Sequence, residues 1–169
     1  MNFVKKQPTF TFGSKHKIKD VLPHQNSTDI EIANKDELKK IIDEPCLKAC
    51  EHLFEKNIQT VDSGCNAVDS PNSAYIVIRY DTLDEKNKKI ADKLVDNISV
   101  FFEKRNGINI RQLYDKLRIE IPTTPETTVS IVEQQLMAIV KNFISQKRII
   151  KRLDLSELIA YQQKMYEQN

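Results

Sequence analysis

The segment that most constrains the fold is residues 74–80, Ala-Tyr-Ile-Val-Ile-Arg-Tyr, because its residues favour an extended backbone. Its unbroken apolar centre predicts a strand that is buried on both faces. A helix is predicted directly after it, over about 83–96, because apolar residues recur there at helical spacing. Thr82 and Glu85 have the spacing of a capping box at the start of this helix. The centre of the chain therefore requires a fold that combines a sheet with helices.

Further elements are predicted on both sides of this centre. Capping boxes, or a proline in the first turn, mark the starts of the other helices, and alternating or continuous apolar runs mark the other strands. A polar stretch rich in Ser, Asn, Asp and Gly, residues 62–73, is predicted to be the longest internal loop. The helices are expected to start at Asn34–Glu37, after Pro45 (46–56), at Thr124–Pro125 and at Asp154–Glu157, and the strands are expected at 58–61, 98–102, 108–110 and 117–121.

Two boundaries within this scheme matter for the fold. Asn106-Gly107 favours a type I′ turn, so a hairpin is expected between strands 98–102 and 108–110. The helix that begins at Thr124 is expected to end near Lys147-Arg148, with an apolar stripe on one side. The stripe consists of Val129, Val132, Leu136, Ile139, Val140 and Phe143.

This order of elements predicts an α+β two-layer sandwich. Its sheet is expected to be mainly antiparallel, with about four to five strands and with the helices packed on one face. Strands 58–61 and 74–80 are expected to pair antiparallel, and a ferredoxin-like arrangement is one variant. A length of 169 residues, of which 40% are hydrophobic and 30% charged, is typical of one globular domain.

The charges divide the chain unevenly. Residues 1–28 carry a net charge of +4, residues 29–81 carry −5, and residues 82–169 carry +3. Because residues 1–28 have little periodic apolar content, they are predicted to form a flexible basic arm before a single α+β domain at 29–169. Within the arm, Thr9-Phe10-Thr11-Phe12 alternates like an edge strand that could add to a partner's sheet.

No apolar run approaches the roughly 20 residues of a membrane span, and the first residues lack the apolar core of a signal peptide. A soluble, cytoplasmic protein with no membrane contact is therefore expected. The three cysteines cannot all pair within one chain, which fits a reducing compartment.

Cys46 and Cys50 lie four residues apart on a predicted helix, and His52 is close to them in sequence. This pattern suggests a metal site, but His52 lies roughly 200° around the helix from Cys50, so it cannot join the pair. Both cysteines coincide with the apolar stripe of the helix. They are therefore predicted to pack in the core, with no metal bound.

The predicted loop 62–73 contains the best candidates for catalysis. Cys65 is expected to be exposed there, where a thiol with a lowered pKa could act as a nucleophile beside His52. Asp62 and Asp69 are the loop's carboxylates. Nothing in the spacing requires Cys65 and His52 to meet, so an inert loop cysteine is the preferred interpretation.

The glycines and a group of acidic residues give two further signals. Three glycines, Gly13, Gly64 and Gly107, cannot form a P-loop or a dinucleotide fingerprint, so no cofactor is expected. Acidic residues gather where strand 74–80 meets the next helix, a frequent position for ion-binding or catalytic groups. Helix capping is the preferred explanation, because carboxylates are favoured at a helix N-terminus. These residues are Asp81, Asp84 and Glu85.

The densest group of basic residues lies near the end of the long helix and could contact phosphate groups. A helix C-terminus also favours cations through its dipole, and a net charge of only +2 argues against a dedicated nucleic-acid binder. The group consists of Lys141, Lys147, Arg148, Lys151 and Arg152.

These observations favour a small non-enzymatic protein-binding or regulatory module that acts through a surface or by self-association, as a homo-oligomer. The alternative is an enzyme with its site in loop 62–73, using Cys65 or the Asp62 and Asp69 carboxylates. A further alternative is nucleic-acid contact through the basic arm and residues 141–152.

Overall fold

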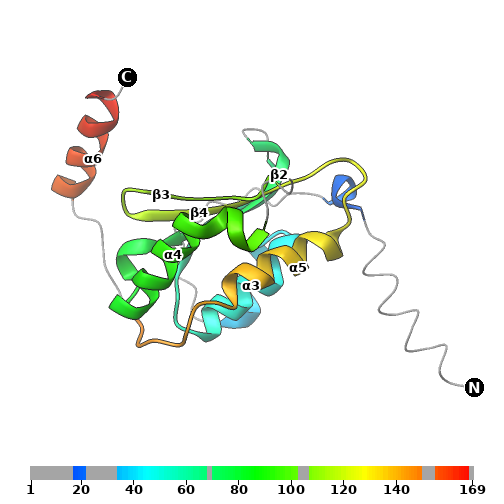
Figure 1. Cartoon of the computed structure of the whole chain (residues 1–169), viewed down its shortest axis with the longest axis horizontal. Coiled ribbons are helices and arrows are strands. Elements are labelled where there is room, and N and C mark those ends of the chain that lie inside the picture. Colours follow the sequence, from blue (N-terminus) through cyan, green and yellow to red (C-terminus); the bar gives the residue numbers. More distant parts are fainter. Residues whose placement is uncertain (1–16, 22–33, 68–69, 103–106, 150–154, 168–169) are drawn as a thin grey trace, which may run out of the picture.

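The computed structural model describes residues 17–21, 34–67, 70–102, 107–149 and 155–167 (Figure 1). Its centre is a four-stranded antiparallel sheet in the order β1-β2-β4-β3. The strands are β1 (Thr60–Ala67), β2 (Ser70–Arg79), β3 (Asn109–Leu113) and β4 (Lys116–Pro122).

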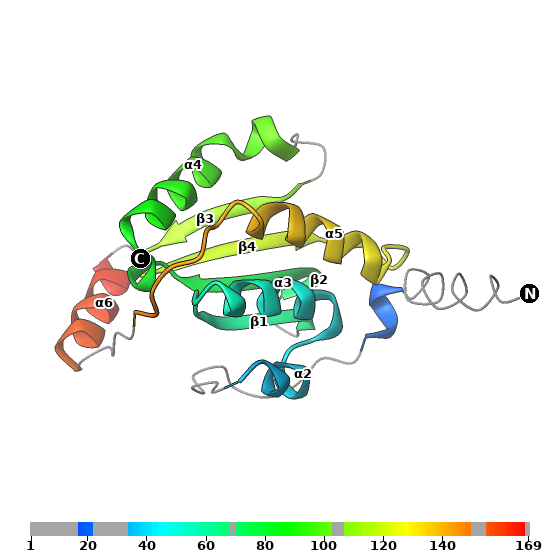
Figure 2. The ribbon, with the colours of Figure 1, turned by 90° about the horizontal axis from the view of Figure 1, so that it is seen from below.

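The main helices lie on one side of this sheet, so the predicted α+β two-layer sandwich is confirmed (Figures 1 and 2). They are α3 (Glu44–Glu55), α4 (Glu85–Phe102) and α5 (Val129–Val140). Two further helices are α2 (Leu38–Ile41) and α6 (Leu155–Glu167). The ferredoxin-like variant is wrong, because that fold places a helix between its first two strands, whereas β1 and β2 form a direct hairpin.

The core lies between the sheet and its helices. Strand β2 is buried on both faces, as predicted, from Ser73 to Arg79. Strand β4 alternates between buried and partly exposed side chains, as predicted for 117–121. The apolar stripe of α5 is also confirmed, because each predicted residue from Val129 to Phe143 is buried.

The predicted loop at 62–73 is wrong. Residues 62–67 belong to β1 and residues 70–73 to β2, and in this hairpin Ser63 pairs with Ile76 and Cys65 with Ala74. The polar residues fit because the ladder is irregular, with register shifts, and because Asn66 adopts a positive φ of 58°. Asparagine tolerates that conformation better than most residues do, and bulges let a strand accommodate extra residues.

The predicted strand 98–102 is also wrong, because α4 continues to Phe102. Its residues extend the helical repeat that begins at Glu85, and helix propagation adds one hydrogen bond per residue. The hairpin expected at Asn106-Gly107 therefore does not form between two strands, although β3 is close to the predicted 108–110. Strand β3 pairs instead with β4, and Leu113 lies opposite Lys116.

The ends of two helices differ from the prediction. Helix α5 begins at Val129 with Thr128 as its N-cap, whose side chain accepts a hydrogen bond from Ile131 N, and it ends at Val140. Thr124 caps a short turn instead, accepting from Glu126 N at 3.3 Å. In α4 the first turn is capped by Asp84, which accepts from Asn87 N at 2.9 Å, so the Thr82–Glu85 capping box is wrong.

The predicted starts at Asn34 and Pro45 are confirmed. Asn34 accepts a hydrogen bond from Glu37 N at 3.2 Å before α2, and Pro45 lies in the first turn of α3. Helix α6 is the last predicted helix, although Asp154 lies outside the described residues. No helix in the described part of the chain has both the length and the apolar character that crossing a bilayer requires.

Residues 17–21 pack against the domain, although the sequence places them in the predicted arm. Ile18 is 1% exposed and Val21 is 7% exposed. The backbone of Ile18 donates to Thr127 O at 2.8 Å and accepts from Asn66 Nδ2 at 2.7 Å. These residues therefore belong to the domain, and the rest of the predicted arm, including Thr9–Phe12, lies outside the described residues.

Candidate binding surface

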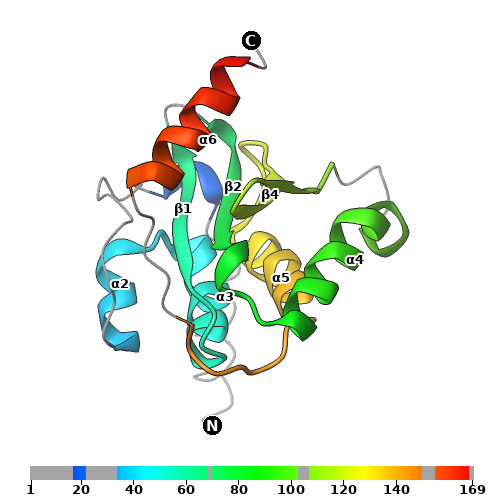
Figure 3. The same cartoon turned by 90° about the vertical axis from the view of Figure 1, so that its left-hand side faces the viewer.

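After α5 the chain runs without regular secondary structure through residues 141–149, which we call the strap. The strap is coloured orange in Figure 3 and passes below the ends of α3 and α4 in that view. Its residues alternate between core and solvent. Phe143 and Gln146 are buried, whereas Lys141, Lys147 and Arg148 are exposed.

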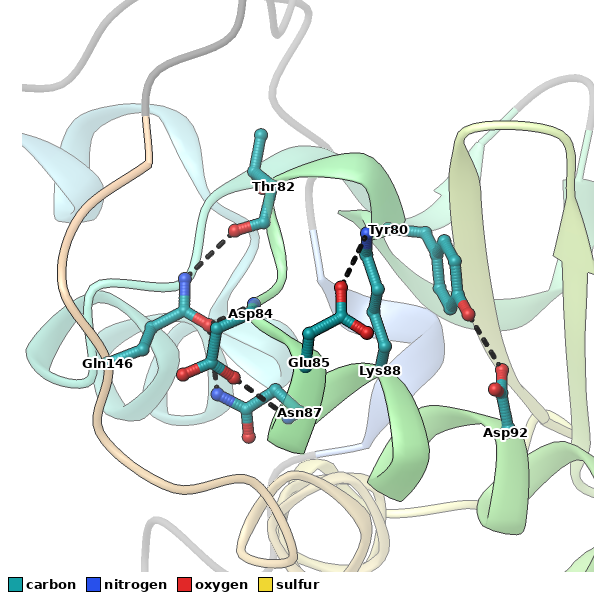
Figure 4. A network of polar contacts seen from close by, with 8 residues as sticks. All are labelled: Tyr80, Thr82, Asp84, Glu85, Asn87, Lys88, Asp92 and Gln146. Atoms are coloured by element: carbon teal, nitrogen blue, oxygen red, sulfur yellow. Dashed lines mark hydrogen bonds and ion pairs between the residues drawn. The ribbon is translucent and has the colours of Figure 1, made fainter.

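Gln146 holds the strap to the ends of both helices, and its side chain is only 8% exposed. Its Oε1 accepts from Asp84 N at 2.9 Å, and its Nε2 donates to Thr82 O at 2.9 Å (Figure 4). Its backbone N–H donates to Lys56 O at 3.1 Å, and its carbonyl accepts from Asn57 Nδ2 at 2.7 Å. Gln146 therefore joins the end of α3, the start of α4 and the strap.

Asn87 forms the second half of this anchor from the first turn of α4, and it is fully buried at 0% exposure. Its Nδ2 donates to Gln146 Oε1 and to Ile144 O, each at 2.9 Å. Its Oδ1 accepts from Ile144 N at 2.9 Å. The amide thus pairs with Ile144 as a neighbouring strand would, and this pairing satisfies partly buried backbone groups of a segment that has no ladder of its own.

The Gln146 Nε2–Thr82 O and Asn87 Nδ2–Gln146 Oε1 hydrogen bonds are buried, and the other side-chain bonds of the anchor are partly buried. Losing one partner of a buried bond would leave the other unsatisfied at a cost of about 1–3 kcal/mol. The strap is therefore fixed relative to the helices although it is extended. Lys147 and Arg148 directly follow Gln146 in the chain, and both are exposed.

Other positive charges lie beside the strap. Lys56 Nζ donates to the carbonyl of Phe143. The pKa of His52 is lowered, first by burial and then by the positive charge of Lys56, and Lys141 lowers it further. We call Lys56, Lys141, Lys147 and Arg148 the basic surface.

A small cavity of about 40 Å³ lies beside the basic surface. Its lining combines aliphatic and aromatic side chains with amide, hydroxyl and guanidinium groups. Leu38 and Ile58 at this cavity are fully buried, whereas Gln59 and Arg148 are exposed. The lining residues are Leu38, Phe54, Asn57, Ile58, Gln59, Thr60, Arg148 and Ile149.

The expectation that Cys65 is an exposed loop thiol is wrong. Cys65 lies in β1 with 0% exposure, and its backbone N–H donates to Asp43 Oδ2 at 2.8 Å. Burial raises the pKa of its thiol to about 12, so it is protonated at neutral pH and poorly suited to nucleophilic attack.

The other candidates from the predicted loop do not join Cys65. By register, Asp62 lies opposite Val77, on the sheet face away from the helices, whereas Cys65 lies opposite Ala74 on the core face. Asp62 accepts a hydrogen bond from Tyr75 Oη at 3.5 Å. Asp69 lies outside the described residues.

Cys46 and Cys50 are core residues, as predicted. Cys46 Sγ contacts Tyr75 O at 3.5 Å and Gly64 O at 3.7 Å. Burial raises the pKa of Cys50 to about 12. Within the described residues, no group of three or more His, Cys, Asp or Glu side chains is placed to hold a metal ion.

The acidic residues at the start of α4 have separate structural partners. Asp84 is the N-cap, as the capping interpretation predicts for this group. Asp81 forms an ion pair with Arg79, with Nη2 and Oδ2 2.7 Å apart, and Glu85 lies 3.8 Å from Lys88 (Figure 4 shows the latter pair). None of these contacts brings the carboxylates together as one site.

The predicted phosphate-contacting residues are only partly described. Lys141, Lys147 and Arg148 are exposed, whereas Lys151 and Arg152 lie outside the described residues. The explanation by a helix C-terminus holds for Lys141, the C-cap of α5, but is wrong for Lys147 and Arg148, because the helix ends at Val140.

Gln146 and Asn87 are not predicted as site residues from the sequence. Each amide has polar neighbours along the chain, Ser145 and Lys147 for Gln146 and Lys86 and Lys88 for Asn87. That pattern does not separate an anchor from an exposed surface residue. Comparison of the chain with protein-family models, with curated proteins and with solved structures finds no match.

Proposed function

We propose that this protein is a non-enzymatic binding module that docks an acidic segment of a partner protein on its basic surface. The observation that carries the proposal is the anchored strap, which holds Lys147 and Arg148 exposed directly after the buried Gln146. A fixed backbone supports binding, because less conformational entropy is lost when a partner docks.

Charge favours an anionic partner. The basic surface combines Lys56 and Lys141, whose charges act together on His52, with the exposed Lys147 and Arg148. Positive charges gathered on one surface speed encounter with an acidic partner and favour its correct orientation.

The surroundings of the charges favour a protein over a nucleic acid. Ile144 on the strap is 42% exposed, and the neighbouring cavity has apolar walls. Single-stranded nucleic acids are typically bound by exposed aromatic rings that stack on the bases. The strap's one aromatic residue, Phe143, is instead buried in the core.

The positions of the reactive groups also support binding over catalysis. Cys65 is buried with a raised pKa, Asp84 caps α4, and Asp43 accepts the Cys65 amide. Each of these groups has a role in the fold that accounts for its position.

The proposal is tested with a fluorescein-labelled decamer of glutamate, whose binding is followed by anisotropy at about 50 mM salt. Reversing two charges with Lys147→Glu and Arg148→Glu is expected to weaken binding at least tenfold. The matched control is Arg111→Glu with Lys116→Glu, which makes the same change in net charge on exposed residues of β3 and β4, and binding should stay within about twofold of wild type.

Melting temperatures of both variants should match wild type, because all four side chains are exposed. No binding of the peptide, or equal losses in the two double variants, would contradict a specific basic surface. A labelled 20-nucleotide DNA strand that binds more tightly than the peptide, and only with Lys147 and Arg148 intact, would replace the protein partner with a nucleic acid.

A further inference from the structure

We infer that the cavity beside the strap receives one aliphatic side chain of the acidic partner segment, so that the segment recognised is a leucine-like residue flanked by carboxylates. The inference rests on the proposed function and adds to it an aliphatic residue that the partner segment must contain. The occupant is a segment of another protein, and a second copy of this chain is an outcome that the test distinguishes.

The cavity has room for an aliphatic side chain. A volume of about 40 Å³ exceeds the ~10–15 Å³ that a single water needs by the same measure. It is adequate for the branched end of a leucine or isoleucine. Filling it would extend the buried core around Leu38 and Ile58, and burial of apolar surface is the main source of affinity at such an anchor.

The polar part of the lining suits the backbone of a bound segment. Asn57 Nδ2 at this cavity already donates to Gln146 O, and the Thr60 side chain is hydrogen-bonded to Cys50. Gln59 brings an exposed amide group, which can both donate and accept hydrogen bonds. A peptide whose side chain enters the cavity needs such partners, because its own N–H and C=O groups lose water on docking.

Arg148 connects the cavity to the basic surface, since it belongs to both. A guanidinium group presents donors in a planar fork that matches a carboxylate. Lys147 is the next residue along the strap. An aliphatic residue in the cavity would thus place the adjacent residues of its segment beside the Arg148 guanidinium, which is the charge complementarity that selects carboxylates at those positions.

The test compares three labelled peptides, each with a central residue between two runs of four glutamates. The central residue is alanine, leucine or tryptophan, and binding is again measured by anisotropy. With the wild-type chain, the leucine peptide should bind about fivefold or more tightly than the alanine peptide. The tryptophan peptide tests the size of the side chain that is accepted, and tighter binding than that of the leucine peptide would overturn the choice of leucine.

A variant with a filled cavity provides the second arm. Gln59→Trp places a large side chain on the exposed rim, and it should reduce the preference for leucine over alanine to less than about twofold. The matched control is Gln112→Trp, the same substitution at an exposed position on β3, which should keep the wild-type preference.

The outcomes separate this inference from the proposed function. Equal binding of the leucine and alanine peptides, with both lost on reversing Lys147 and Arg148, would overturn the cavity's role and leave the basic surface intact. Failure of every peptide to bind would contradict both. A concentration-dependent dimer in sedimentation experiments that Gln59→Trp abolishes would replace the partner segment with a second copy of this chain.

Discussion

At the residue scale, His52 links the charge of the basic surface to stability. Its pKa in the folded protein is lowered by burial and by Lys56 and Lys141, whereas in the unfolded chain it is close to the ordinary value of ~6.5. The unfolded state therefore binds a proton more readily as the pH falls through about 6.5. By linkage, the titration of His52 lowers the free energy of unfolding at acid pH and does not lower it well above pH 6.5.

The free energy of unfolding, measured with urea, should decrease between pH 7.5 and pH 5.5 in the wild-type chain. With His52→Gln, this decrease should be smaller. Other groups titrate in both proteins, including Glu133, whose pKa is raised mainly by burial, so the difference between the proteins isolates His52. An identical pH dependence in both would show that the pKa of His52 is the same in the folded and unfolded states.

At the scale of elements, the strap depends on the amide of Asn87. Asn87→Ala would remove the partner of both backbone groups of Ile144 and one donor to Gln146. We expect a loss of about 2–4 kcal/mol in the free energy of unfolding by urea, since one buried and two partly buried hydrogen bonds of the Asn87 amide are lost together. The glutamate decamer should also bind more weakly, because the cations would lose their fixed backbone.

Asn142→Ala is the matched control, because Asn142 is an exposed residue of the same strap that donates to Ala138 O and Ile139 O. Asn142→Ala should lower the free energy of unfolding by no more than about 1 kcal/mol. A loss equal to that of Asn87→Ala would mean that burial of the amide adds nothing to the anchor.

The elements also show what the sequence can predict. Strand 74–80, the alternation at 117–121 and the stripe of α5 follow from local periodicity, and each is confirmed. The loop predicted at 62–73 and the strand predicted at 98–102 are wrong, because the elements that these residues join override their local propensity. Pairing between β1 and β2 includes residues 62–67 and 70–73, and α4 continues through 98–102.

The candidate site was predicted only in its charges. Exposed cations such as Lys147 and Arg148 are visible in the sequence, but their presentation depends on contacts made across long distances along the chain. Gln146 meets Thr82 and Asn57, which are 64 and 89 residues away. No local pattern records such a contact, so the anchor could be found only once the ends of α3, α4 and α5 were placed together.

At the scale of the whole molecule, the boundary of the domain lies nearer the N-terminus than composition predicts. Ile18 and Val21 belong to the same buried core as the apolar residues of β2 and α5. Ile18 also lies between Thr127, just before α5, and Asn66 at the end of β1. A short segment with a basic, polar composition thus joins two parts of the domain that are distant in sequence.

This arrangement predicts different stabilities for two truncated chains, one beginning at residue 17 and the other at residue 22. Burial of a large aliphatic side chain contributes ~1.5–3 kcal/mol, so losing Ile18 and Val21 should cost roughly 3–5 kcal/mol. In a domain of this size, that corresponds to a melting temperature about 10 °C lower for the shorter chain.

Ile18→Ala in the full-length chain should reproduce about half of the loss in stability. Removing the exposed Lys17–Glu126 ion pair with Lys17→Ala should change the stability little. Equal melting temperatures for the two truncated chains would place residues 17–21 outside the stable core and return the boundary to the position expected from composition.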